Sequence, residues 1–126
     1  MESKQGYSRL TDGQLMGLQE AGASASEILA YAVLTRKHEK AWPDNDMCWA
    51  SIQLISERTG MSVQTAKKAL QRLCRKYFTV DGQPVAVLHR IAGGNNGRAT
   101  RYYDNLWREV RDGRYPNIKD ETITDQ

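Results

Sequence analysis

Lysine, arginine and glutamine side chains recur through residues 62–75 at spacings that place them on one face of a helix. This polar set is Gln64, Thr65, Lys67, Lys68, Gln71, Arg72 and Arg75. The complementary face is apolar and is predicted to meet the core through Ala66, Ala69, Leu70, Leu73 and Tyr77. Ammonium and guanidinium groups bind phosphates, and Gln and Lys also match base edges in a major groove. The pattern predicts a helix that presents these groups to a polyanion such as duplex DNA.

The charge of this segment has one sign. No Asp or Glu lies between Glu57 and Asp81, and residues 62–101 carry eight Lys or Arg against one Asp, a net charge of +7. The whole chain is only +3, so the remaining residues sum to −4. A solvated amphipathic helix is the alternative interpretation, but such helices usually interleave acids and bases as local pairs. The concentration of positive charge therefore indicates a negatively charged partner.

A helix and a tight turn are expected to position the basic helix. Ser51 is predicted to cap the first helix, whose apolar residues lie within 52–55. Gly60 is predicted to end it in a left-handed conformation, and Ser62 to cap the basic helix. Two further helices precede this pair, because residues 11–14 and 24–27 both have the form of a capping box. The second of these is expected to pack beneath the basic helix.

The apolar residues predict which faces of the two earlier helices are buried. In the shorter helix these residues are Leu15, Met16 and Leu18, with Gly22 ending the helix. In the longer helix the predicted buried stripe is Ile28, Leu29, Ala32 and Val33, with Tyr31 and Leu34 alongside and a basic end at Arg36, Lys37 and His38.

The periodicity becomes strand-like after the basic helix. Residues 85–91 and 99–103 are predicted to pair across a Gly- and Asn-rich tip, after a turn at Asp81 and Gly82, and residues 39–48 are predicted to be a loop. Arg98 and Arg101 make this hairpin basic, so we expect it to approach phosphates or a minor groove. No exposed aromatic platform is evident, so single-stranded DNA is expected to bind more weakly. A short helix with Leu106, Trp107 and Val110 should follow, and residues 113–126 are predicted to be a poorly ordered tail.

Length and composition narrow the remaining possibilities. The chain has 126 residues, 40% hydrophobic and 26% charged, which fits one globular domain. The longest apolar run, residues 28–34, is too short for a membrane span, and no secretory pattern is evident, so we expect a cytoplasmic protein. Cys48 and Cys74, taken with His38 and His89, match no common zinc spacing. We therefore expect no metal and no other cofactor.

Residues 24–103 resemble the winged helix-turn-helix DNA-binding family. The resemblance lies in the helix-turn-helix at residues 51–73 and the wing at residues 90–102, and it is closest to small regulators, replication initiators and partition factors of phages and plasmids. Ser56 stands where many such motifs have Ala, but it is small enough for close helix packing. The resemblance implies an α+β, mainly helical fold with a three-helix core and a β-hairpin wing. An N-terminal extension with a short helix (residues 1–23) and a C-terminal helix and tail (residues 104–126) would flank it.

The resemblance also implies roles for individual residues. Base contacts would come from Val63, Gln64, Lys67 and Lys68, phosphate contacts from Ser62 and Thr65, and wing contacts from Arg98 and Arg101. The helical spacing adds Gln71 and makes Arg72 and Arg75 backbone anchors.

The resulting hypothesis is a non-enzymatic, sequence-specific binder of double-stranded DNA that acts as a homodimer or an array on chromosomal or plasmid DNA. The two termini are candidate contacts for another protein. A winged-helix module for protein interaction or dimerisation is the alternative. An enzyme is disfavoured, because the sequence has no Ser-centred nucleophile motif, no phosphate-binding glycine loop followed by Lys and no carboxylate and His cluster.

Overall fold

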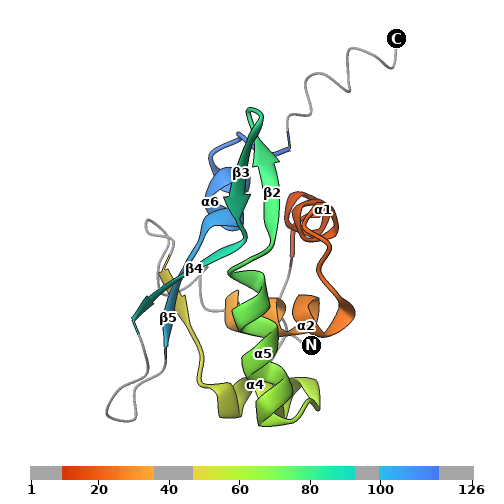
Figure 1. Ribbon diagram of the computed structural model, residues 1–126, viewed down its shortest axis with the longest axis vertical. Coiled ribbons are helices and arrows are strands. Elements are labelled where there is room, and N and C mark those ends of the chain that lie inside the picture. The colour runs from red at the N-terminus through yellow and green to blue at the C-terminus, as the bar shows by residue number, and fades with distance from the viewer. Residues whose placement is uncertain (1–9, 36–46, 93–99, 117–126) are drawn as a thin grey trace, which may run out of the picture.

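The computed structural model describes residues 10–35, 47–92 and 100–116, shown as coloured ribbon in Figure 1. The predictions for Arg36, Lys37, His38, the loop residues 39–46, the hairpin tip at 93–97, Arg98 and residues 117–126 lie outside this part of the chain. The helices are α1 (Asp12–Glu20), α2 (Ala25–Thr35), α4 (Ile52–Thr59), α5 (Val63–Leu73) and α6 (Asn105–Arg111). The strands are β1 (Met47–Trp49), β2 (Tyr77–Val80), β3 (Gln83–Ala86), β4 (Leu88–Ala92) and β5 (Arg101–Asp104). This confirms the predicted mainly helical fold with a small antiparallel sheet.

Both predicted capping boxes are present. At α1 the Gln14 amide donates to Thr11 Oγ1 at 3.1 Å, and the Thr11 amide donates to Gln14 Oε1 at 2.9 Å. At α2 the Glu27 amide donates to Ser24 Oγ at 3.2 Å, and the Ser24 amide donates to Glu27 Oε1 at 2.9 Å. These bonds satisfy backbone donors that the first turn of a helix leaves without partners.

The buried faces of α1 and α2 differ from the predicted ones. Leu15 and Met16 are exposed, whereas α1 buries Gly13, Gln14, Gly17 and Leu18. In α2, Leu29 is 51% exposed, and Glu27 is buried together with Ala30, Tyr31 and Leu34. The prediction was correct for Leu18, Tyr31 and Leu34, which are buried, and for Ile28 and Val33, which pack against the core. It was wrong for Leu15, Met16 and Leu29, because it counted only apolar residues. Gln14 bonds to Tyr31 and Glu27 bonds to Lys76. Because these partners satisfy the two polar side chains, each helix buries the face that carries Gln14 or Glu27 and not its most apolar face.

Helices α2, α4 and α5 form the three-helix core. Ser51 Oγ accepts from the Leu54 amide at 3.0 Å and Ser62 Oγ from the Thr65 amide at 3.1 Å, as predicted. Gly60 has φ of 80°, the left-handed conformation that lets the chain turn from α4 into α5. Helix α2 packs against both α4 and α5, which confirms that it lies beneath them.

The predicted burial of Tyr77 is wrong. Helix α5 ends at Leu73, and Tyr77 begins β2 with a side chain that is 50% exposed. Strand alternation then turns the neighbouring Phe78 into the core. The helical period therefore overestimated the length of α5 by about one turn.

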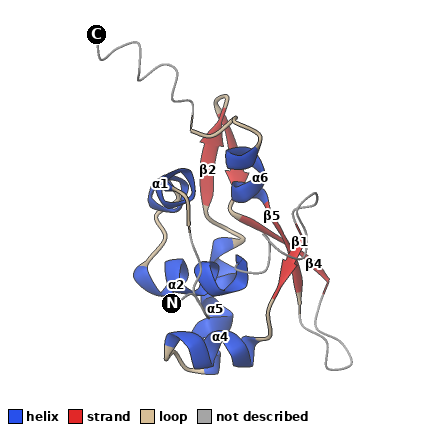
Figure 2. Ribbon diagram, turned by 180° about the vertical axis from the view of Figure 1, so that it is seen from behind, coloured by secondary structure: helices blue, strands red, loops and turns tan. Residues whose placement is uncertain are grey.

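The strands of the described residues form two antiparallel sheets. The predicted strand at 85–91 is divided at Val87, whose amide donates to Lys76 O at 2.9 Å and whose carbonyl accepts from the Asn105 amide at 3.1 Å. Strand β3 pairs with β2 across the predicted turn, whereas β4 joins a second sheet of order β1-β5-β4. Strand β1 occupies residues 47–49, so the prediction of a loop through residue 48 was also wrong at its end. Figures 1 and 2 both show this three-stranded sheet on one side of α5 and α1 on the other.

The C-terminal part of the described chain returns to α1. Asp104 caps α6 by accepting from the Trp107 amide at 3.0 Å, and Leu106 is buried against Gly17 of α1. Tyr115 is buried as well, and its hydroxyl donates to Glu20 Oε1 at 2.7 Å. The expected poorly ordered tail from residue 113 is therefore wrong for residues 113–116. No helix within the described ranges is long and apolar enough to cross a membrane.

Candidate nucleic-acid interface

The outward face of α5 carries the polar residues that its sequence period predicted. The exposed residues at its start and along its length are Ser62, Val63, Gln64, Thr65, Lys67, Lys68, Gln71 and Arg72, and Arg75 is exposed just beyond its end. Ala66, Ala69, Leu70 and Leu73 are buried on the other side. The sharp division between the two faces holds α5 against the core and leaves its cations in solvent.

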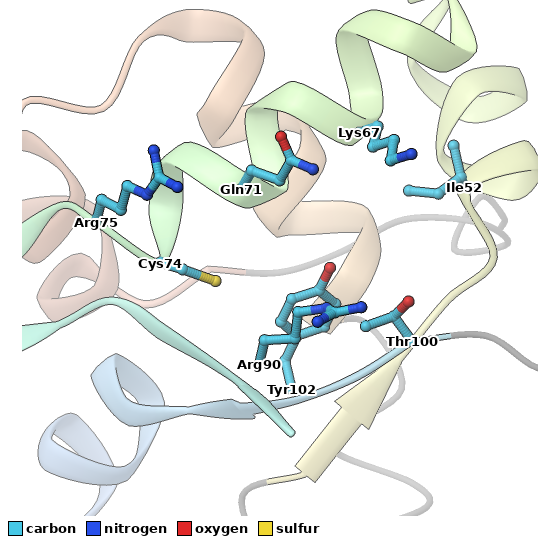
Figure 3. Close-up of a pocket in the computed structure, with 8 residues that line it drawn as sticks. All are labelled: Ile52, Lys67, Gln71, Cys74, Arg75, Arg90, Thr100 and Tyr102. Carbon is cyan, nitrogen blue, oxygen red and sulfur yellow. The ribbon is translucent and has the colours of Figure 1, made fainter. Parts of the chain in front are cut away.

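A groove of about 520 Å³ separates α5 from the three-stranded sheet (Figure 3). Helix α5 and the residues after it contribute Lys67, Gln71 and Arg75, which are spaced four apart and so form one stripe. The sheet contributes Arg90 and Tyr102, which are cross-strand partners on β4 and β5. Ile52, Cys74 and Thr100 complete the lining. No acidic side chain is among these described residues.

The C-terminal end of α5 is held by a buried carboxylate that the charge count did not anticipate. Glu27 is 2% exposed, and its Oε1 accepts from Lys76 Nζ at 2.6 Å, while its Oε2 lies 4.0 Å from Arg72 Nη1. Lys76 also donates to Gly22 O at 2.9 Å. Lys76 therefore forms an ion pair within the protein, and this pair neutralises one of the positive charges of residues 62–101. Arg72 stays largely exposed at the edge of this cluster.

The same contacts set the ionisation of Glu27. Burial of the carboxyl alone would raise its pKa. The hydrogen bonds from Lys76 and Ser24, together with the charges of Lys76 and Arg72, outweigh burial and lower the pKa below its ordinary value of 4.5. The cluster is consequently charged at neutral pH.

Arg90 is a groove residue that the sequence-based site list missed. It lies two residues after the buried Leu88 on β4 and opposite Tyr102, so strand alternation turns it toward α5. The signal that would have identified it is this period of two, once β4 is known to start at Leu88. Arg101 is on the opposite face of the sheet, because its neighbour Tyr102 is buried. The structure thus brings Arg90, and not Arg101, to α5.

Tyr102 and Cys74 add neutral groups to the groove. Burial raises the pKa of Tyr102 to about 12, so its hydroxyl is protonated at neutral pH. Burial also raises the pKa of the Cys74 thiol. Cys74 and the buried Cys48 are both reduced cysteines. Within the described residues, no three His, Cys, Asp or Glu side chains gather in a way that could hold a metal ion.

A comparison with protein families matches the helices of this site but not the sheet side of the groove. A family model described as a helix-turn-helix domain matches residues 24–78, from the cap of α2 into β2. No curated protein and no solved structure matches the chain significantly. The matched range contains α2, α4 and α5. The paired strands β4 and β5 of the three-stranded sheet correspond to the predicted wing. The chain is therefore similar to helix-turn-helix domains over residues 24–78, and its mainly helical fold with a small antiparallel sheet is that of a winged helix-turn-helix.

Proposed function

We propose that this protein binds double-stranded DNA in a sequence-specific manner and catalyses no reaction. The observation that carries the proposal is the acid-free, exposed face of α5, which continues across the groove to Arg90. An α-helix fits the major groove, and the match of residues 24–78 to a helix-turn-helix domain supports this use of α5.

The two stripes of α5 support two different roles. Gln64 and Lys68 are four residues apart on the exposed face of α5 and do not line the groove, and there an amide suits an adenine edge and an ammonium group a guanine edge. Lys67 and Arg75 face the groove with Arg90, so we assign these three to the phosphates of one strand running between α5 and the sheet.

The remaining residues of the site have supporting roles in this proposal. Val63 would contact bases, and Ser62 and Thr65 would contact phosphates at the start of α5. Ser62 Oγ already donates to Thr65 Oγ1 at 2.9 Å, so the pair is oriented before DNA arrives. Gln71 and Arg72 extend the surface toward the end of α5, and Arg98 remains the proposed wing contact.

We propose that the protein serves as a transcriptional regulator, replication initiator or partition factor of a mobile element or bacterial chromosome, in the cytoplasm. We infer that it acts as a homodimer or as an array along DNA. A selection from random duplexes tests the second point. A recovered palindrome supports a symmetric dimer, whereas direct repeats support an array.

The decisive experiment is a salt titration of duplex binding. The logarithm of the association constant should fall linearly with the logarithm of salt concentration, with a slope of about −0.9 for each phosphate contacted. Arg75→Ala and Arg90→Ala should each make this slope less steep by about 0.9, the amount expected for the loss of one phosphate contact. The matched control is Arg111→Ala on α6, an exposed arginine outside the groove, which should leave the slope unchanged. A flat salt response of the wild type would contradict DNA binding and favour a protein-interaction module.

A further inference from the structure

The three-stranded sheet has an outer face that is distinct from the groove. Cys48 and Tyr102, which are register partners, are both buried on the side of α5. Because successive side chains of a strand point to opposite faces, the residues on either side of them point outward. This outer sheet face consists of Met47, Trp49, His89, Arg101 and Tyr103.

Two of these residues form an exposed aromatic pair. The rings of His89 and Tyr103 are stacked across β4 and β5, with centroids 6.2 Å apart and planes 14° from parallel. His89 is exposed and Tyr103 is 43% exposed. The sequence-based expectation that the chain lacks an exposed aromatic platform is therefore wrong. The two rings lie far apart in sequence, and only strand pairing brings them together.

The charge of the outer sheet face favours a nucleic acid as its occupant. Arg101 is exposed beside Tyr103 and pairs in register with Trp49. None of the five residues is acidic. Aromatic rings that stack on bases, next to a cation that contacts phosphate, are the features with which proteins bind unpaired strands.

We propose that the outer sheet face binds single-stranded nucleic acid, with bases stacking on Tyr103 and His89 and phosphates contacting Arg101. This face is continuous with the proposed duplex site, because the consecutive residues His89 and Arg90 lie on opposite faces of β4. A duplex held in the groove and an unpaired strand on the outer face would then share the strands β4 and β5. That continuity depends on the proposed function, whereas stacking on the outer face does not.

The test measures binding of a fluorescent oligo-dT of about 15 nucleotides by anisotropy at one salt concentration. Tyr103→Ala should weaken binding roughly 5- to 150-fold, the range expected for loss of one stacked base. Tyr103→Phe keeps the ring and should bind like the wild type. Tyr77→Ala is the matched control, since Tyr77 is similarly exposed but lies in the separate β2-β3 hairpin. It should have no effect.

Several outcomes would overturn the proposal. They are failure of the wild type to bind oligo-dT, equal losses for Tyr77→Ala and Tyr103→Ala, and a loss for Tyr103→Phe as large as for Tyr103→Ala. A change of Tyr103→Ala from dimer to monomer in sedimentation, with oligo-dT binding intact, would assign the face to a second copy of the chain. If melting shows that Tyr103→Ala does not fold, His89→Ala replaces it and carries the same expectation.

A second pair of variants separates this proposal from duplex binding. Lys68→Ala and Arg75→Ala, which change α5 and the groove, should weaken duplex binding and leave oligo-dT binding intact. Wild-type protein that binds oligo-dT but no duplex would contradict the proposed function alone. Protein that binds duplex but no oligo-dT would contradict the inference alone.

Discussion

Individual side chains of α5 differ in what they face. Gln64 and Lys68 are exposed and do not line the groove, whereas Lys67 lines the groove with Arg75. Base edges carry sequence information and phosphates do not, so substitutions in the two groups should have different effects on specificity.

Gln64→Ala and Lys68→Ala should each relax the preference at particular base pairs, at a cost of about 1 to 3 kcal/mol. Arg75→Ala should weaken all duplexes alike, because it contacts only backbone in this proposal. Sequence logos from parallel selections with each variant measure the difference. An unchanged logo for Gln64→Ala would mean that the side chain does not contact bases.

Glu27 gives a prediction that depends on pH. Its folded-state pKa lies below 4.5, so its contribution to stability is fully present above that pH and is lost as the pH falls through the folded-state value. Glu27→Gln should lower the free energy of unfolding at pH 7 by about 1.5 to 3 kcal/mol, the range for hydrogen bonds to charged groups. Thermal melts of both proteins from pH 7 to pH 3 should converge below pH 4.5. A difference that stays constant over this range would contradict the assignment.

At the scale of elements, the contact between α1 and α6 depends on a missing side chain. A Cβ at Gly17 would lie 2.4 Å from Cδ1 of the buried Leu106, whereas at Gly13 it would lie 3.0 Å from Cγ1 of the half-buried Val110. The first contact is too short for real atoms, and the second requires only a small adjustment. Gly17 therefore fixes how closely the two helices approach.

Gly17→Ala should destabilise the protein by about 1 to 2 kcal/mol, because overpacking costs more than the roughly 0.5 to 1 kcal/mol that Ala gains in a helix. Gly13→Ala in the same helix is the matched control and should be nearly neutral. Chemical denaturation measures both values, and DNA affinity should not change, because neither residue lies on α5 or lines the groove. A Gly17→Ala variant as stable as the wild type would show that the helices can separate without cost.

At the scale of the whole molecule, one buried polar network joins the N-terminal, central and C-terminal elements. The Tyr31 hydroxyl donates to the Asp104 carboxylate, at 3.0 Å from Oδ1 and 2.9 Å from Oδ2, and accepts from Gln14 Nε2 at 2.9 Å. Burial and the Asp104 charge raise the pKa of Tyr31 well above its ordinary value, so the donor proton is retained. The network links α1, α2 and the junction of β5 with α6.

Tyr31→Phe should therefore destabilise the entire fold, by about 1 to 3 kcal/mol, because it removes the buried hydroxyl that bonds to both Gln14 and Asp104. Melting should remain a single transition at a lower temperature, and duplex affinity below that temperature should be unchanged. Tyr77→Phe removes an exposed hydroxyl and should have no effect on melting. Loss of α1 in a separate, earlier transition would contradict the unifying role of the network.

The sequence by itself determined the features that depend on neighbours along the chain. The caps at Ser51 and Ser62, the left-handed Gly60 and the buried Ala66 and Leu70 follow from bonds and contacts within about one helical turn. The helix-turn-helix and its basic face were predictable for this reason.

Only the tertiary structure decided which residues meet across the fold. Buried partners turned Gln14 and Glu27 inward, and Val87 divided a predicted strand by bonding to Lys76 and Asn105. Pairing with β5 placed Arg90 in the groove and stacked His89 on Tyr103. Each of these outcomes depends on groups far away in sequence, and a local period carries no information about which distant group a side chain will meet.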